Sequence, residues 1–214
     1  MPTVLLTGFE PFGGETTNPS WTAVRGVLAA WDGAAALLAR RLPVAFDLSG
    51  PALATALEET CPDIVICVGQ AGGATGIRLE RVAINLDDAR IADNTGHQPI
   101  DEPIVPGGPS AYFATLPVKA AVAAIGALGI PAEVSHSAGT YACNHVFYLL
   151  MHKLEQAGHG ARGGFVHVPF GPDQTAGTDR PSLPIGSMVA ALTAVVETAL
   201  STRTDLAVVG GALH

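Results

Sequence analysis

Hydrophobic and polar residues along the chain follow two alternating patterns, one typical of buried strands and one of helices with an apolar face. Short, nearly continuous apolar runs predict strands covered on both faces, at Val4–Thr7, Leu37–Val44, Ile64–Val68, Leu79–Asn85, Ala132–His136 and Gly164–Val168. Longer segments predict helices at Ser20–Trp31, Pro51–Thr60, Val118–Leu128, Tyr141–Ala157 and Pro184–Thr202. This alternation indicates an α/β fold. Tight hairpin turns are absent between several neighbouring strands, so we expect a mostly parallel mixed sheet with room for an antiparallel edge.

Local signals mark where some of these helices begin. Asn18-Pro19 places an amide cap before a proline in the first turn, and Ser49 is a candidate cap for the second helix. Thr140 or Ser137 is a candidate cap for the fourth. The apolar, glycine-rich tail of residues 204–214 is compatible with an added strand, with packing on a neighbour or with fraying.

The longest stretch without a regular pattern covers residues 87–109, which are polar and rich in proline, glycine and aspartate. A loop of this length inside a compact domain is usually functional or disordered. Because it follows a buried strand directly, we expect it to form part of a site. No repeat, linker or change of composition divides the chain, so residues 1–214 are expected to form a single catalytic α/β domain.

Composition narrows the classes of function. The chain is 48% hydrophobic, only 14% charged and has a net charge of −8, which argues against nucleic acid and anionic membrane surfaces as partners. Low charge also fits a surface partly hidden in subunit contacts. No apolar run reaches the roughly 18 to 20 residues that span a bilayer, and we expect no secretory signal. Three cysteines, Cys61, Cys67 and Cys143, form no C-x-x-C pair, which favours free thiols in a reducing cytoplasm.

Cys143 is the first candidate for chemistry, because it falls in the first turn of a predicted helix. A helix N-terminus stabilises a thiolate and offers backbone N–H donors to an oxyanion. A buried structural cysteine is the alternative, and position alone favours it. His145 is the nearest histidine, but residues two apart on a helix point about 200° away from each other. We therefore do not expect His145 to serve as the base.

The remaining histidines divide into two groups. His145, His152 and His159 recur every seven residues and share one helix face, where they are too far apart to bind one metal ion. His167 lies near the C-terminal end of a predicted strand, and ligands of open α/β sheets bind beyond such ends. His136 also ends a strand and is a candidate to brace the cysteine loop. We therefore expect His167 to face a site.

Glu80-Arg81 interrupts an apolar strand pattern. Alternation places the two side chains on opposite faces, so one of them points inward. A buried glutamate bonded to a histidine would orient the ring and stabilise its imidazolium form. An exposed ion pair at a sheet edge is the favoured alternative when this dipeptide is considered alone.

The segment after the first strand, "TGFEPFGG", resembles a phosphate loop only in spacing. Gly8 and Gly13 have the spacing of the outer glycines, but Gly14-Glu15 replaces the lysine and hydroxyl that phosphate requires. The loop offers Phe9 and Phe12 instead. Two rings on a tight backbone predict an apolar slot for a flat, neutral group.

Together these segments resemble the pyrrolidone-carboxylate peptidases, also called pyroglutamyl peptidases of type I. The resemblance covers nearly the whole chain in the family's order. It rests on "LLTGFEPFGGETTNPSW" from residue 5, "VGQAGG" at 68–73, "LERVAINLDDARIADNTGHQPID" at 79–101, "SAGTYACNHVFY" at 137–148 and "GFVHVPF" at 164–170. One such motif is weak evidence, but five in order are specific.

The resemblance implies an α/β/α sandwich around a twisted, mostly parallel mixed sheet, and a cytoplasmic homotetramer without metal or cofactor. It implies a cysteine exopeptidase that cleaves the amide bond after an N-terminal pyroglutamyl residue through a thioester. The implied catalytic residues are Glu80, Cys143 and His167. The implied substrate-binding residues are Phe9, Phe12, Gln70 and Arg90, and Asp93 has a supporting role.

The chain departs from the family pattern just before the nucleophile. It has Tyr141-Ala142 where the family favours Phe-Val, which puts the tightness of the pocket in question but not the chemistry. Two other functions remain open at this point. One is a phosphorylase-like α/β enzyme, which Glu15 in the first loop argues against, and the other is a binding module without catalysis.

Overall fold

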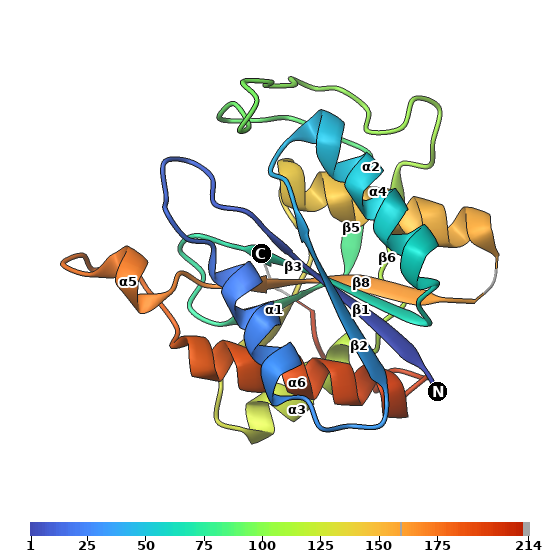
Figure 1. The fold of residues 1–214 in the computed structure, drawn as a ribbon, viewed down its shortest axis with the longest axis vertical. Coiled ribbons are helices and arrows are strands. Elements are labelled where there is room, and N and C mark those ends of the chain that lie inside the picture. The colour runs from blue at the N-terminus through green and yellow to red at the C-terminus, as the bar shows by residue number, and fades with distance from the viewer. Residues whose placement is uncertain (159, 212–214) are drawn as a thin grey trace.

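The computed structural model describes residues 1–158 and 160–211, in which a six-stranded sheet lies between two layers of helices (Figure 1). The strands, in spatial order, are β2 (Ala36–Leu42), β1 (Thr3–Phe9), β3 (Ile64–Gln70), β8 (Arg162–Val168), β4 (Ile77–Glu80) and β7 (Ala132–Ser135). β4 and β8 are antiparallel, whereas the other neighbouring pairs are parallel. A separate hairpin pairs β5 (Val82–Ile84) with β6 (Ala111–Phe113). The predicted three-layer α/β/α sandwich around a mixed, mostly parallel sheet is confirmed.

The helices form one layer on each face of the sheet (Figure 1). One layer contains α1 (Pro19–Ala30), α3 (Val118–Ala127) and α6 (Ile185–Ser201); the other contains α2 (Phe46–Thr60) and α4 (Ala142–Ala157). Alternate strand residues enter two cores: Leu6 and Val68 pack with the α1 and α6 side, while Leu5 and Cys67 pack with the α4 side. Both faces are therefore covered, which explains the nearly continuous apolar strands.

The first helix begins as its sequence predicts, but the second does not. Asn18 caps α1, with its Oδ1 accepting a hydrogen bond of 3.1 Å from the backbone N–H of Ser20. The prediction of a helix from Pro51 with Ser49 as its cap is wrong, since α2 begins at Phe46 and Ser49 lies inside it. The first N–H of α2 donates to Oδ2 of Asp93 at 2.8 Å, a contact 47 residues away in sequence that local patterns do not reveal.

The predicted side-chain caps of α4 are also wrong. The N-cap residue is Tyr141, and no side chain caps the first turn. The Thr140 hydroxyl donates instead to the carbonyl of Asp88 at 2.7 Å, and Ser137 Oγ accepts from the N–H of Gly139 at 3.2 Å. The first-turn amides of α4 are therefore not occupied by a neighbouring side chain.

Other differences lie in short elements and in the tail. The predicted strand Leu79–Asn85 divides into β4 and β5, which belong to different sheets, and β6 and α5 (Pro172–Thr175) were not predicted. Residues 204–211 add no strand. The tail packs on α3 through Asp205, whose carboxylate accepts the N–H groups of Lys119 and Ala120; residues 212–214 are outside the described part. Among the described residues, no helix combines the length and hydropathy that a membrane crossing requires.

Candidate active site

Glu80 and His167 meet on the face of the sheet covered by α4. In the antiparallel pair of β4 and β8, Arg78 lies opposite His167 and Glu80 opposite Phe165, so Glu80 and His167 are diagonal neighbours on one face. His167 Nδ1 lies 2.8 Å from Glu80 Oε1, and the two residues are only 5% and 1% exposed. The exposed ion pair favoured for Glu80-Arg81 alone is therefore wrong for Glu80. On this strand, an exposed ion pair joins Arg78 to Glu133 at 2.8 Å.

Cys143 reaches the site of Glu80 and His167 from α4, the helix that covers this face of the sheet. It is the second residue of α4, and its Sγ would lie 2.7 Å from a Cβ atom added to Gly69. Gly69 on β3 pairs with His167 on β8, so the two lie side by side beneath the sulfur. A glycine is required here because any larger side chain would occupy the position of the thiol.

The electrostatics of His167 reflect these neighbours. Burial lowers the pKa of the imidazole, but the charge of Cys143 and hydrogen bonds to Cys143 and Glu80 outweigh it and raise the pKa to about 10. The ring is therefore an imidazolium at neutral pH, paired on one side with Glu80 and on the other with Cys143. This is the arrangement that a thiolate nucleophile and a proton donor require.

The other two cysteines lie in different environments. Cys67 is fully buried, and burial raises the pKa of its thiol to about 12; a hydrogen bond with Thr7 lowers it and nearby Cys143 raises it. Cys61 is exposed at the end of α2, and none of the three is in a disulfide. Cys143 alone combines partial exposure with a helix N-terminus and an adjacent imidazolium.

The two phenylalanines of the first loop occupy different positions. Phe9 is only 2% exposed and packs on Phe165 in the core, with ring centroids 6.3 Å apart. Phe12 is half-buried and packs on Tyr141, with centroids 6.1 Å apart. Tyr141 is close to both Cys143 and Asp93, and burial together with these groups raises its pKa to about 12. Phe12 and Tyr141 therefore form an accessible aromatic wall beside the thiol, whereas Phe9 belongs to the core.

In the described part of the chain, the side chains of Gln70 and Arg90 make no hydrogen bond with Cys143 or His167. The side chain of Gln70 shares the sheet face of Val68, opposite the face of Cys143, and its Oε1 accepts 3.0 Å from Nε2 of Gln174. Its backbone extends beyond the last paired residues of β1 and β3, Thr7 and Cys67, and is the part of Gln70 nearer the site. Arg90 is exposed in the loop after β5. That loop is attached to α4 because the N–H of Asp88 donates to Thr140 at 2.9 Å.

The predicted histidine face of α4 has no common partner. His145 bonds to Asp87, with Nδ1 2.7 Å from Oδ2, and His152 Nδ1 lies 2.8 Å from the Tyr112 hydroxyl. His159 is outside the described residues, and His136 is exposed after β7. Within residues 1–158 and 160–211, no three His, Cys, Asp or Glu side chains are arranged to hold a metal ion.

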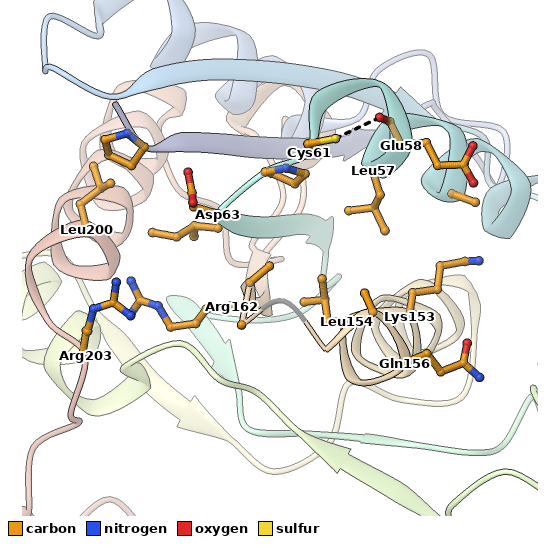
Figure 2. A pocket seen from close by; sticks show the side chains of 17 residues that line it. Leu57, Glu58, Cys61, Asp63, Lys153, Leu154, Gln156, Arg162, Leu200 and Arg203 are labelled. Carbon is orange, nitrogen blue, oxygen red and sulfur yellow. Dashed lines mark hydrogen bonds between the residues drawn. The ribbon is translucent and has the colours of Figure 1, made fainter.

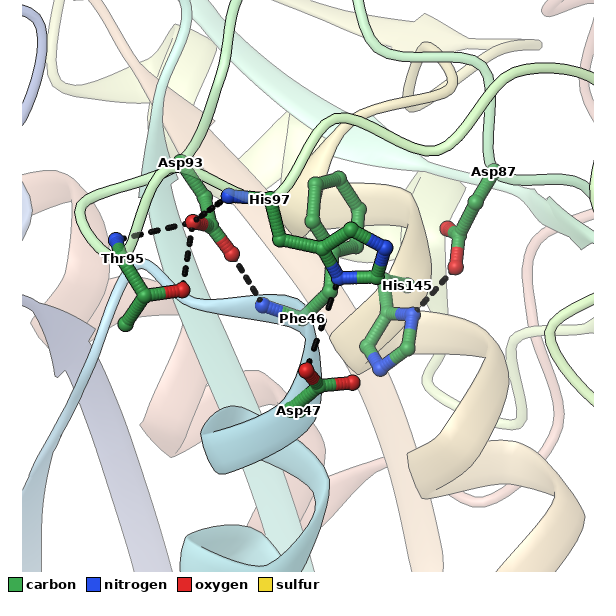
Figure 3. Close-up of polar contacts among 7 residues, drawn as sticks. All are labelled: Phe46, Asp47, Asp87, Asp93, Thr95, His97 and His145. Atoms are coloured by element: carbon green, nitrogen blue, oxygen red, sulfur yellow. Dashed lines mark hydrogen bonds and ion pairs between the residues drawn. The ribbon is translucent and has the colours of Figure 1, made fainter.

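Asp93, for which the family resemblance implied only a supporting role near the site, holds part of the structure together. Its Oδ1 accepts from the backbone and hydroxyl of Thr95 and from the N–H of His97, while Oδ2 caps Phe46 (Figure 3). Burial opposes the charged form, but these hydrogen bonds lower the pKa of Asp93 below its ordinary value. Asp93 thereby holds the loop on α2.

Asn144, the residue after Cys143, has a role that sequence reasoning missed. Its amide is fully buried and bonds to the N–H of Ile84 at 3.0 Å and to the carbonyls of Ile84 and Leu86 at 2.9 and 3.0 Å. A polar residue flanked by His145 and apolar positions in a helix is the signal that points to such a buried contact. Asn144 fixes the start of α4 to the end of β5.

A cavity of about 790 Å³ lies at the other edge of the sheet. Its lining includes Pro2, Asp63 and Arg162, which stand at the N-terminal ends of β1, β3 and β8, together with Arg203 (Figure 2). Cys143 and His167 belong to the opposite, C-terminal edge. The cavity is therefore separate from the thiol and its histidine.

Comparison with known proteins shows the family and the fold. The family model described as "Pyroglutamyl peptidase" matches residues 2–202. The chain is 60% identical to the pyrrolidone-carboxylate peptidase of Clavibacter michiganensis subsp. michiganensis and 55% identical to that of Pectobacterium carotovorum subsp. carotovorum, over 100% of each chain. Its structure resembles the crystal structure of Bacillus amyloliquefaciens pyroglutamyl peptidase I, with a TM-score of 0.93, 48% identity and coverage of 96% of this chain and 100% of that one.

Proposed function

Because the chain belongs to the pyroglutamyl peptidase family, we propose that it is a cysteine peptidase that removes an N-terminal pyroglutamyl residue from peptides. The observation that carries the proposal is the convergence of Glu80, His167 and Cys143 around Gly69. These residues come from β4, β8, α4 and β3, so the catalytic unit is proposed to be the single domain of residues 1–214.

The proposed reaction begins with the Cys143 thiolate. Its sulfur attacks the carbonyl carbon of the scissile amide and forms a C–S bond, and the carbonyl oxygen becomes an oxyanion. This oxyanion accepts hydrogen bonds from N–H groups of the uncapped first turn of α4. Arg90 is the proposed cationic group near that oxygen. The His167 imidazolium gives its proton to the leaving nitrogen, the C–N bond breaks, and a thioester remains.

The second half of the reaction regenerates the thiol. His167, now neutral, takes a proton from a water molecule whose oxygen attacks the thioester. The C–S bond breaks, pyroglutamate leaves as the acid, and the imidazolium and thiolate form again. Glu80 keeps Nδ1 protonated and fixes the ring orientation throughout, because its Oε1 accepts that hydrogen bond at 2.8 Å.

Recognition of the substrate is proposed to depend on shape and on a few backbone contacts. A pyroglutamyl ring has no free amine, so it requires an apolar slot and hydrogen-bond partners for a lactam. Phe12 supplies the accessible ring of the slot, and Phe9 is a buried ring that packs on Phe165. The backbone of Gln70 beyond β1 is the proposed partner for the lactam, since its side chain is engaged by Gln174.

The test is hydrolysis of a pyroglutamyl chromogenic amide, with an alanyl amide as the substrate control. We expect Cys143→Ala to reduce kcat/KM at least about 10³-fold while thermal unfolding stays two-state. Cys61→Ala is the matched control, because Cys61 is exposed and remote from His167. Its kinetics and its inactivation by iodoacetamide should equal those of the wild type. Hydrolysis that survives in Cys143→Ala would rule out this function.

We further propose that the chain acts in the cytoplasm as a homo-oligomer, a tetramer by family resemblance. Free thiols support a reducing compartment, and a charge content of 14% supports a partly covered surface. Phe113, at 68% exposure, is one apolar side chain that an interface would cover. Light scattering at micromolar concentration should give about four times the 21.8 kDa of one chain; a monomer would contradict the assembly but not the catalysis.

A further inference from the structure

A second buried histidine–carboxylate pair lies two residues beyond Cys143 on α4. His145 donates through Nδ1–H to Oδ2 of Asp87 over 2.7 Å, and the residues are 8% and 5% exposed (Figure 3). Among the described residues, His145 Nε2 and Asp87 Oδ1 have no hydrogen-bond partner. The proposed chemistry does not use this pair, because helix geometry turns His145 away from the Cys143 sulfur.

Asp87 belongs to a segment that we call the strap, residues 84–102, which runs from β5 past the start of α4. Its two ends are joined, since the N–H and carbonyl of Asp87 pair with the carbonyl and N–H of Glu102 at 2.7 and 2.9 Å. Asn144 holds the beginning of the strap through its three hydrogen bonds. His145 is therefore one of two consecutive α4 residues that bind the strap immediately after Cys143.

The middle of the strap is attached to the residues before Cys143. The N–H of Asp88 donates to the carbonyl of Thr140, whose hydroxyl returns a bond to the Asp88 carbonyl at 2.7 Å. The Tyr141 hydroxyl donates to the carbonyl of Ala92 at 3.2 Å. The strap is thus bonded on both sides of Cys143, and it carries Arg90.

Phe46 connects the pair to the aromatic wall. Its ring makes an edge contact with His145, with centroids 5.4 Å apart and planes at 85°. A similar contact joins Phe46 to Tyr141, at 5.4 Å and 89°, and Tyr141 packs on Phe12. The Phe46 ring also makes an edge contact with His97, with centroids 5.9 Å apart (Figure 3). A continuous row of rings therefore leads from the buried pair to Phe12.

We infer that Asp87 and His145 are positioning residues that fix the strap and, through Phe46 and Tyr141, the aromatic wall of the pyroglutamyl slot. The link to the slot rests on the proposed function; the anchoring of the strap does not. A buried ionic pair adds little net stability compared with an apolar one, but it defines a single geometry when both partners are present. Loss of the pair should therefore weaken substrate binding more than it slows the chemistry of Cys143.

The central variant is the double substitution Asp87→Ala/His145→Ala, which leaves neither a buried charge nor a lone partner. We expect KM for a pyroglutamyl amide to rise about tenfold while kcat changes less than about threefold. The rate of Cys143 alkylation by iodoacetamide should stay within about twofold of wild type, because the thiol and His167 are untouched. His145→Asn places an amide N–H near the position of Nδ1 and should restore most of KM.

Hydrogen–deuterium exchange tests the strap without relying on activity. The amides of Asp87 and Asp88 are hydrogen-bonded to Glu102 and Thr140, so they should exchange slowly in the wild type and in His145→Asn. They should exchange at least about tenfold faster in the double variant. His152→Ala is the matched control, since His152 lies two turns further along α4 and bonds to Tyr112 rather than to the strap.

Each result decides one part of the inference. Unchanged exchange in the double variant would overturn the anchoring of the strap. Faster exchange with an unchanged KM would overturn the link to the slot. If the wild-type protein does not hydrolyse pyroglutamyl amides, the proposed function fails, and the exchange experiment still decides the anchoring. If the double variant does not fold, the two single variants decide the anchoring. Asp87→Asn keeps an acceptor for Nδ1–H and His145→Asn keeps a donor, so both should show wild-type exchange and KM. Faster exchange in both would overturn the role of the hydrogen bond in anchoring the strap.

Discussion

His167 Nδ1 and Glu80 Oε1 lie 2.8 Å apart on adjacent antiparallel strands, and both side chains are almost completely buried. Burial alone would favour a neutral ring. Cys143 and Glu80 reverse that preference and raise the pKa of His167 to about 10, well above its usual 6.5. His167 is therefore protonated in the folded protein at neutral pH, which makes the free energy of unfolding depend on pH and also supplies a proton for the proposed catalysis.

The first prediction concerns alkaline pH. Between pH 6.5 and about 10 the folded protein holds the His167 proton and the unfolded chain does not, so the contribution of His167 to the free energy of unfolding is complete below pH 6.5 and is lost as pH rises to about 10. Urea unfolding of the wild type should show this decline. Glu80→Gln should lower the pKa of His167, measured by NMR of the ring protons, and flatten the decline. An unchanged ring pKa in Glu80→Gln would contradict the coupling.

A second prediction concerns the glycine beneath the sulfur. A Cβ added at Gly69 would lie 2.7 Å from both Cys143 Sγ and the Phe165 ring, so Gly69→Ala must displace the thiol or the ring. We expect a loss of activity of about 10²-fold, since a shift of about 1 Å at a reacting atom has effects of that size. The iodoacetamide rate and the kcat/KM of the variant are the measurements.

Gly126→Ala is the matched control for that substitution. Gly126 is exposed in α3 and nothing lies within 4 Å of an added Cβ. Alanine there should raise the free energy of unfolding by about 0.5–1 kcal/mol and leave the kinetics unchanged. Equal losses of activity in the two variants would show that the close approach at Gly69 is not what matters.

The third prediction separates Phe9 from Phe12. Phe9 is buried against Phe165, so Phe9→Ala should lower the free energy of unfolding by about 3–5 kcal/mol. Phe12 is half-buried beside Tyr141, so Phe12→Ala should cost less stability but raise KM for a pyroglutamyl amide far more than it changes kcat. Urea unfolding and steady-state kinetics on both variants give the comparison. Wild-type kinetics in Phe12→Ala would remove Phe12 from the slot.

Sequence reasoning predicted the features that local periodicity determines. The apolar runs of β1 and β3 and the Asn18 cap of α1 follow from nearest-neighbour chemistry and are confirmed. Cys143 and His167 became candidates because a helix start and a strand end are recognisable from a few residues each, although position alone favoured a structural role for Cys143 and the family resemblance was needed to choose. Glu80 needed the family resemblance, since its burial depends on the diagonal contact with His167 across two strands.

What the sequence did not predict depends on contacts between distant residues. The cap of α2 comes from Asp93, 47 positions away, so the local signal at Ser49 indicated the wrong start. The Leu79–Asn85 run divides into two strands because the chain leaves one sheet for another at Arg81, although its apolar pattern is that of one continuous strand. The partners of Asn144 could not be predicted, because Ile84 and Leu86 become its neighbours only in the folded chain.

The fourth prediction concerns Asp93, whose pKa is held below its ordinary 3.8 because hydrogen bonds from Thr95, Phe46 and His97 outweigh the effect of burial. A carboxyl group whose pKa is lowered by folding stabilises the folded protein at pH values above its pKa in the unfolded chain. This contribution is lost as pH falls through its pKa in the folded protein. Asp93→Asn would turn an amide N–H₂ toward the N–H of Phe46, or lose the acceptor for Thr95. We expect the free energy of unfolding at pH 7 to fall by about 1–3 kcal/mol.

The pH dependence and a neighbouring aspartate make the Asp93 prediction specific. The difference between wild type and Asp93→Asn should shrink as pH falls below 3.8, because Asp93 of the unfolded chain then takes up a proton while the folded carboxylate stays charged until pH reaches its lowered pKa. Asp88 is in the same loop but exposed, so Asp88→Asn should change stability by less than about 0.5 kcal/mol at either pH. Urea unfolding of the three proteins at pH 7 and pH 3 makes the comparison. A difference between wild type and Asp93→Asn that is the same at both pH values would show that the charge of Asp93 does not hold the loop on α2.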